Sequence, residues 1–151
     1  MRLGFYGFIV SLIVLGACSG GVNDNPATAS LSTREKMRYE QYMVQGKLLY
    51  QQKCSNCHQE DGSGLARLIP PLDSADYMLS DMGRTACIIK NGMEGAIEVN
   101  GILYNQPMPT NEQLTDIEVA QILTYVGNAW SNQSGYYSAG KVSDILEKCD
   151  E

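Results

Sequence analysis

Two cysteines and a histidine, Cys54, Cys57 and His58, are the residues of this sequence with the clearest chemistry. Thiols three residues apart can each form a thioether with one haem vinyl group, and an imidazole directly after the second thiol can reach the iron. The alternatives are a thioredoxin-like pair, which belongs to a βαβ pattern, and a zinc site, which needs four Cys or His ligands. The chain lacks the βαβ pattern, and because His58 is its only histidine it has no second Cys/His cluster. The motif therefore predicts one covalently bound haem c.

The second axial ligand of the iron must come from elsewhere, and methionine is the natural candidate because no other histidine exists. Met108 precedes Pro109, which biases it toward an extended conformation, so a stiff loop can present its thioether. Met93, beside the Asn91-Gly92 helix stop, is the rival. Met37 and Met43 lie on the expected first helix, before the attachment site. Met78 and Met82 lie on expected short helices, where methionine is typical of core packing. We predict His58 and Met108 as the axial ligands.

The first residues have the pattern of an export signal. Arg2 is followed by an apolar run from Phe5 to Leu15, and small residues precede Cys18. The run is too short to span a membrane. Leu15-Gly16-Ala17-Cys18 resembles a bacterial lipobox, which implies acylation of Cys18. An ordinary secretory signal is the alternative, and either reading places the domain outside the cytoplasm, on the periplasmic side of a bacterial membrane.

Two further cysteines, Cys87 and Cys149, are not needed for haem or lipid. Spare thiols often pair in an oxidising compartment. We expect a disulfide that ties the end of the chain back onto the domain. The alternative is two unpaired cysteines, one of them buried as a small apolar side chain.

The chain is acidic, with eleven basic and seventeen acidic residues, and removal of residues 1–17 takes away only Arg2. This balance argues against nucleic acid as a partner and against electrostatic adhesion to anionic lipid. The acidic net charge is compatible with a redox partner that has a basic docking patch. No catalytic arrangement is evident, so we expect neither an enzyme nor a small-molecule substrate.

Composition divides the chain into a signal peptide at 1–17, a lipidated N-terminus and tether at 18–33, a domain at 34–131 and a tail at 132–151. The tether is small and polar. A flexible chain of that length has a typical reach of about 20 Å and an upper limit of about 50 Å.

The domain is predicted to be all-α with one short hairpin. The first helix has a buried stripe containing Gly46, which costs roughly 1 kcal/mol relative to alanine and so indicates close contact with the last helix. The last helix starts at a capping box of Thr115 and Glu118 and continues toward Trp130. Shorter elements are expected between these two helices: a helix from Ala75 capped by Ser74, one capped by Ser80 or Asp81 that ends at Asn91-Gly92, and a hairpin turning at Asn100-Gly101.

In this order the motifs resemble a class I monohaem cytochrome c of the bacterial type. The resemblance spans residues 40 to 131 and rests on these positions: Gly46, Tyr50, Cys54, Cys57, His58, Asp61-Gly62-Ser63-Gly64, Pro70-Pro71-Leu72, Asn91-Gly92-Met93-Glu94-Gly95, Val99-Asn100-Gly101, Tyr104, Met108-Pro109, Leu123-Thr124-Tyr125-Val126 and Trp130. The extra cysteine pair and the tail are departures from the family pattern.

The resemblance implies roles for several residues around the haem. A carbonyl of Pro70 or Pro71 would accept a hydrogen bond from His58 and fix its tautomer. Leu72 would pack on the haem. Tyr104 would either approach a propionate or pack across the hairpin.

The function that follows is a lipid-anchored carrier of single electrons between a respiratory donor and a terminal oxidase or reductase. Two alternatives stay open: a five-coordinate haem sensor or peroxidase-like domain, and a dedicated haem subunit of a multi-component redox complex.

Overall fold

The computed structural model describes residues 25 to 149; the predicted export signal, Cys18 and the first part of the predicted tether lie outside them. The described elements are a 3-10 turn η1 (Pro26–Thr28), α1 (Thr33–Lys53), α2 (Ser55–His58), α3 (Asp76–Ser80), α4 (Met82–Asn91), β1 (Ile97–Val99), β2 (Ile102–Tyr104), α5 (Asp116–Val126) and α6 (Ala139–Leu146). The predicted fold class, a helical domain with one short hairpin, is confirmed. No helix within the described residues is long and apolar enough to cross a membrane.

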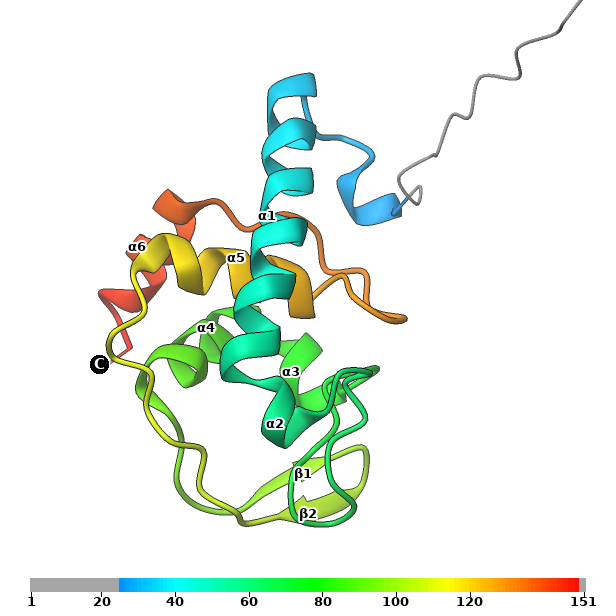
Figure 1. Ribbon diagram of the computed structural model, residues 1–151, viewed down its shortest axis with the longest axis vertical. Helices are drawn as coiled ribbons and strands as arrows, with labels where there is room; N and C mark the ends of the chain where they lie inside the picture. Colours follow the sequence, from blue (N-terminus) through cyan, green and yellow to red (C-terminus); the bar gives the residue numbers. More distant parts are fainter. Residues whose placement is uncertain (1–24, 150–151) are drawn as a thin grey trace, which may run out of the picture.

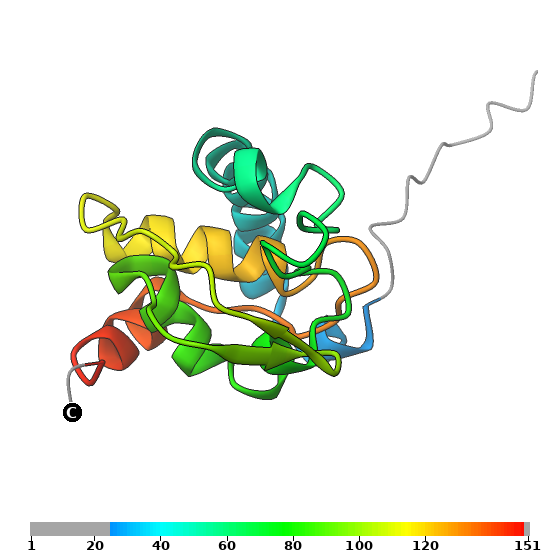
Figure 2. The same ribbon diagram turned by 90° about the horizontal axis from the view of Figure 1, so that it is seen from below.

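The longest helix, α1, crosses α5 at Gly46 (Figure 1). A Cβ atom on Gly46 would lie 2.1 Å from the carbonyl oxygen of Gln121 and 2.7 Å from the Cβ of Tyr125. Only glycine permits this approach, so the close contact predicted from the sequence is confirmed. Seen from below, α5 lies between α1 and the layer that contains α4 and the hairpin (Figure 2).

Capping boxes define the starts of both crossing helices. At α5, the Thr115 hydroxyl accepts from the N–H of Glu118 and the Glu118 carboxylate accepts from the N–H of Thr115, as predicted. Ser32 and Glu35 form the same arrangement at α1. These contacts satisfy backbone donors that have no partner within the helix.

The core forms where α1, α4, α5 and α6 meet. Tyr50, Tyr125 and Trp130 pack ring against ring, with centroids 5.5 to 5.9 Å apart. Met78 and Met82 are buried in the same core, as the sequence predicted for methionines on these helices. The side chains that are almost completely buried are Tyr50, Val119, Ile122, Leu123, Thr124 and Val142.

Two shorter helices differ in how well their starts were predicted. Asp81, one of the two candidates, caps α4 by accepting from the N–H of Arg84. The predicted Ser74 cap of α3 is wrong: α3 starts at Asp76, whose N–H donates to the side chain of Asn100. Ser74 has a φ of 52° and donates its own N–H to Asn132. A contact with the hairpin has taken the place of a local cap.

The last predicted helix ends earlier than its apolar spacing indicated. α5 stops at Val126, and Trp130 has a φ of 57°. Two asparagines direct the chain after it. Asn128 donates to the carbonyls of Thr124 and Gly135, and the buried Asn132 donates to those of Val126 and Leu72. Side-chain amides therefore satisfy carbonyls that a longer helix would have used.

The packed structure continues beyond residue 131, where the sequence predicted a tail. Ser138 caps α6, whose Val142 is completely buried against the core. A disulfide joins Cys149, just after α6, to Cys87 in α4, with their Cα atoms 5.5 Å apart. The amphipathic α6 thus covers a face of α4 and α5.

The packed structure also begins before residue 34, inside the predicted tether. Asn25 is buried and donates through its side chain to Asn128, 2.6 Å away. Its own Oδ1 accepts from the N–H of Ala27 and caps η1. The segment from residue 25 to α1 is therefore held against the loop that follows α5.

Candidate functional site

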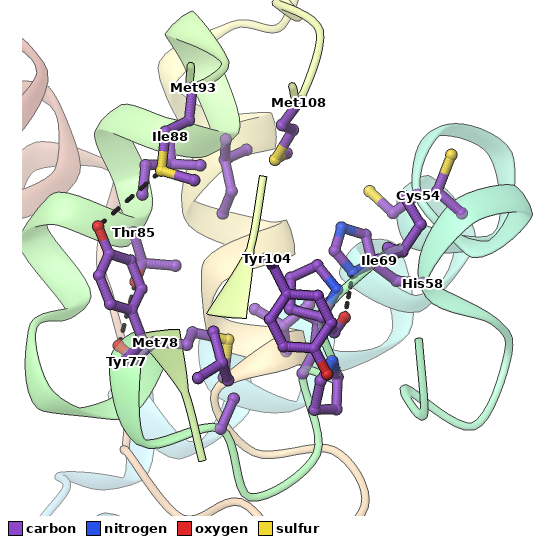
Figure 3. A pocket seen from close by; sticks show the side chains of 18 of the residues that line it. Cys54, His58, Ile69, Tyr77, Met78, Thr85, Ile88, Met93, Tyr104 and Met108 are labelled. Carbon is purple, nitrogen blue, oxygen red and sulfur yellow. Dashed lines mark hydrogen bonds between the residues drawn. The ribbon is translucent and has the colours of Figure 1, made fainter. Parts of the chain in front are cut away.

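An apolar pocket lies between α2, the 69–72 segment, the 75–89 region and the loop after β2 (Figure 3). Apolar side chains form most of its wall. The lining residues are Tyr50, Cys54, Cys57, His58, Ile69, Pro70, Pro71, Leu72, Ala75, Tyr77, Met78, Thr85, Ile88, Ile89, Met93, Ile97, Val99, Tyr104, Gln106, Pro107, Met108, Pro109, Ile122 and Val126. Every cofactor-binding residue predicted from the sequence is in this set.

The two thiols reach the pocket because the chain changes direction where α1 ends. Cys54 departs from helical geometry, with φ −120° and ψ −37°, while its N–H still donates to the carbonyl of Tyr50. The single turn of α2 then carries Cys57 and His58 to the same wall. Burial raises the pKa of Cys54 to about 11, whereas Cys57 is exposed. Both cysteines line the pocket and are not joined to each other by a disulfide.

The imidazole of His58 is oriented by a backbone carbonyl. Its Nδ1 lies 3.1 Å from the carbonyl oxygen of Pro70. A carbonyl can only accept, so Nδ1 carries the proton and Nε2 keeps its lone pair. Burial lowers the pKa of His58, and the Pro70 carbonyl opposes this effect. A neutral imidazole with a lone pair on Nε2 is a metal ligand.

A glycine allows the Pro70 carbonyl to reach this position. Gly64 has a φ of 70°, and its N–H donates to the carbonyl of His58. A Cβ atom on Gly64 would lie 2.4 Å from the carbonyl oxygen of Ile69 and 2.6 Å from that of Pro70. Only a residue without a side chain fits here.

The two candidate methionines occupy different environments in the pocket. Their backbones pair antiparallel: each N–H donates to the other's carbonyl at 2.9 Å. The sulfur of Met93 accepts a hydrogen bond from the Tyr77 hydroxyl at 3.9 Å. Figure 3 shows this contact as a dashed line, with Met108 and His58 entering the pocket from other segments. Among the described residues no hydrogen bond to the Met108 sulfur occurs, so this thioether is available to a metal.

The loop that carries Met108 is fastened to the end of α4. Gly92, with a φ of 73°, passes so close to the loop that a Cβ atom would lie 2.4 Å from the carbonyl oxygen of Met108. Asn111 donates to the carbonyls of Lys90 and Ile89. The Lys90 ammonium in turn donates to the carbonyls of Glu112 and Leu114. These contacts fix the path of the segment on both sides of Met108.

Leu72 and Tyr104, the remaining predicted residues, also line the pocket. Leu72 is partly buried and its N–H donates to the carbonyl of Gly62. Tyr104 is buried opposite Ile97 in the hairpin, and its hydroxyl lies 3.5 Å from the carbonyl oxygen of Ala66. In this position Tyr104 both packs across the strands and faces the pocket.

Two residues with clear roles were missed from the sequence. Tyr77 engages Met93, and nothing in a lone tyrosine on a short helix indicates a sulfur partner. Asn132 connects Leu72 and Ser74 to the end of α5. An asparagine shortly after an apolar helix is a weak signal, because only the fold brings residues 72 and 132 together.

The donor set fits a covalently held haem. Two thiols, an imidazole with a lone pair on Nε2, and a thioether surround one pocket whose walls are otherwise apolar. Hydrocarbon walls suit a large flat macrocycle, while nitrogen and sulfur suit its iron. The thiols can attach to vinyl groups, and the other two donors can bind the metal.

A helical domain with this pocket defines a small c-type haem protein. The cytochrome c family model matches residues 43–130, so the chain belongs to the cytochrome c family. Membership implies covalent haem c, single-electron transfer as the function, and other redox proteins as partners. It is an electron-transfer protein and not an enzyme.

Two relatives agree with this assignment. Both are named cytochrome c-552 and come from Thermus thermophilus. Each is 36% identical to this chain over 91 residues, which is 58% of this chain. The match covers 69% of the first relative and 61% of the second.

Proposed function

We propose that this protein is a periplasmic, lipid-anchored cytochrome c that moves single electrons between a membrane-bound respiratory donor and a terminal oxidase or reductase. The observation that carries the proposal is the convergence of His58 and Met108 on one apolar pocket beside Cys54 and Cys57. When bound, the haem supplies an iron that alternates between two oxidation states.

The pocket residues would hold the group in a form suited to outer-sphere transfer. Cys54 and Cys57 would form the two thioether links, and Nε2 of His58 and the sulfur of Met108 would bind the iron. A metal bound by both of these residues would not readily hold oxygen or peroxide. Thioether ligation favours Fe(II) and raises the potential.

The supporting residues would keep these two ligands in place during electron transfer. The Pro70 carbonyl holds the proton of Nδ1 and makes the imidazole a better electron donor. The Met93 backbone holds Met108 by two hydrogen bonds. A rigid ligand set lowers the cost of reorganisation when the charge of the site changes.

The anchor is argued from the N-terminal sequence. Leu15-Gly16-Ala17-Cys18 follows a basic and apolar signal pattern. Acylation of Cys18 would keep the carrier on the membrane that contains its electron donor and acceptor.

Membranes of a strain that lacks this protein offer a direct test. Purified reduced protein should be reoxidised by these membranes in the presence of the terminal electron acceptor, and oxidised protein should be reduced when a respiratory substrate is added. The Met108→Ala variant should be a poorer electron acceptor. Wild-type protein that is neither reduced nor reoxidised by the membranes would refute the carrier function. In the parent strain, which produces the protein, recovery of the full-length protein in the soluble fraction would refute the anchor alone.

A further inference from the structure

Helix α1 has two apolar sides, and only one of them faces the core. Tyr39, Tyr42, Gly46 and Tyr50 are buried against the rest of the domain. On the opposite side of the helix Met37, Val44 and Leu48 are 47 to 60% exposed. These three residues follow helical spacing of seven and four, so they form one stripe about 16 Å long. We call Met37, Val44 and Leu48 the outer stripe.

Basic residues flank the outer stripe. Arg34 lies along one edge, and Lys36 and Lys47 lie along the other, as the 100° rotation per residue requires. All three are exposed. Among the residues of α1, Glu40 is the one carboxylate beside the stripe. The second acid of α1, Glu35, is turned to the N-cap by its hydrogen bonds to Ser32.

The charge of the chain is therefore unevenly distributed. α1 contains five of the eleven basic residues of the sequence but only two of its seventeen acidic ones. The overall acidic charge argues against adhesion to anionic lipid. The excess of acidic residues, however, lies outside α1. An exposed apolar stripe edged by lysine and arginine has the character of helices that lie in the headgroup region of a bilayer.

The position of α1 suits such a contact. Figure 1 shows α1 in front of α5, and Figure 2 shows α1 at the edge of the domain with α5 on its inner side. The described chain begins at Asn25, which is held beside the loop after α5. Asn25 follows Cys18 by seven positions, and a stretch of that length spans at most about 25 Å. An acyl chain on Cys18 would thus keep the domain close to the membrane surface.

We propose that the outer stripe of α1 and its basic edges dock on the anionic phospholipid surface to which the protein is anchored. The nearness of the membrane rests on the proposed acylation of Cys18. The exposed outer stripe and the basic residues beside it are observed independently of that acylation. Docking would hold α1 against the lipid and fix which side of the domain is presented to its redox partners.

Protection of a thiol at position 44 tests this orientation. In the acylated holoprotein the native cysteines are consumed by lipid, haem and disulfide, so Val44→Cys provides one reactive thiol. Gly140→Cys is the matched control, because Gly140 is exposed on α6 and a Cβ atom there would have open space. Each full-length holoprotein is added to preformed vesicles of phosphatidylcholine, or of phosphatidylcholine mixed with phosphatidylglycerol. The rate of labelling by a membrane-impermeant maleimide is then measured.

Labelling at position 44 should be about tenfold slower on the anionic vesicles than on the neutral ones, since each basic residue at an anionic surface strengthens binding roughly fivefold. Salt near 1 M should restore fast labelling, because it reduces the Debye length to about 3 Å. The double variant Lys36→Glu, Lys47→Glu should do the same, because it removes two of the basic residues. The control thiol should react equally on both vesicles. Equal rates at position 44 would overturn the proposal. Protection on both vesicle types that grows with protein density would also overturn it and assign the stripe to a second copy.

The same vesicles separate this proposal from the anchor. Protein that stays on neutral vesicles reports an acylated N-terminus, whatever the state of position 44. Protein that binds only anionic vesicles, with position 44 protected, would support the docking face while refuting the anchor.

Discussion

Met93 and Met108 hold each other's backbones through two hydrogen bonds of 2.9 Å, yet their sulfurs have different surroundings. The Met93 sulfur accepts from Tyr77, and the Met108 sulfur is available in the pocket. The sequence predicted Met108 as the ligand of the iron, with Met93 as its rival. The structure adds a physical reason to prefer Met108, because Tyr77 already engages the Met93 sulfur whereas no hydrogen bond among the described residues engages the Met108 sulfur.

Replacement of each methionine tests this preference. We expect Met108→Ala to remove the charge-transfer absorption of a thioether–iron bond and to lower the reduction potential, because the iron loses a ligand that favours Fe(II). Met93→Leu, the matched control, should keep the charge-transfer absorption and the reduction potential of the wild type. The absorption spectrum of the oxidised protein and a potentiometric titration are the measurements. Loss of the signal in Met93→Leu with its retention in Met108→Ala would reverse the assignment.

Gly64 should affect the haem site through the Pro70 carbonyl. Gly64→Ala places a Cβ atom against that carbonyl, so the hydrogen bond from His58 should lengthen. A weaker bond makes the imidazole a poorer electron donor, and the reduction potential should rise. Gly95→Ala is the control, since Gly95 also has a positive φ but a Cβ atom there would meet nothing within 4 Å.

Both glycine variants should lose about 1–3 kcal/mol of stability from backbone strain, and Gly64→Ala should lose more because of its added clash. Denaturant titration and potentiometry give the two results. A potential that shifts equally in both variants would show that the Pro70 carbonyl has no special influence.

The disulfide should stabilise the domain without shaping the haem pocket. Changing both Cys87 and Cys149 to serine should lower the free energy of unfolding by about 2–4 kcal/mol, because the bond closes a loop with a sequence separation of 62 residues. The thioether absorption should stay, since Met108 is fastened through α4 backbone groups near residues 89 to 93. An unfolding midpoint equal to that of the wild type would show that α6 does not need the bond.

Glu118 should make stability depend on pH at the start of α5. Hydrogen bonds from Thr115 lower the pKa of Glu118 from its ordinary value of 4.5. A carboxyl with a lowered pKa stabilises the fold above the pKa of the unfolded chain, and this stabilisation is lost as the pH falls through the folded-state value. Glutamine can keep the capping contacts but does not titrate.

At pH 7 the free energy of unfolding of the wild type should therefore exceed that of Glu118→Gln by about 0.3–1 kcal/mol. This difference should shrink as the pH falls from about 5 to 3. Unfolding curves of both proteins across this range provide the comparison. A constant difference at all pH values would mean that the ionised carboxylate has no advantage over the amide.

Features set by neighbouring residues were predictable from the sequence. The Thr115 capping box, the Asn91-Gly92 helix stop and the Asn100-Gly101 turn all depend on residues within a few positions of one another. The contact at Gly46 was also predicted, because a helical glycine needs a reason that only close packing supplies.

Features set by residues far apart in the sequence were not predictable from it. The true start of α3 depends on Asn100, and the end of α5 depends on Asn128 and Asn132. Helix α6 had local signals, namely a Ser138 cap followed by Val142 and Leu146. That it forms part of the core is evident only from its packing on α4 and α5. The choice of Pro70 over Pro71 as the partner of His58 likewise needs three dimensions.

The central claim is that protein ligands fill both axial positions of the iron, so that the molecule carries electrons instead of binding a gas or peroxide. Titration of the reduced holoprotein with carbon monoxide at neutral pH tests it most directly. We predict no rapid change in the spectrum of the wild type and rapid binding to Met108→Ala. Rapid carbon monoxide binding to the wild type would contradict the account and favour a five-coordinate sensor or peroxidase-like site.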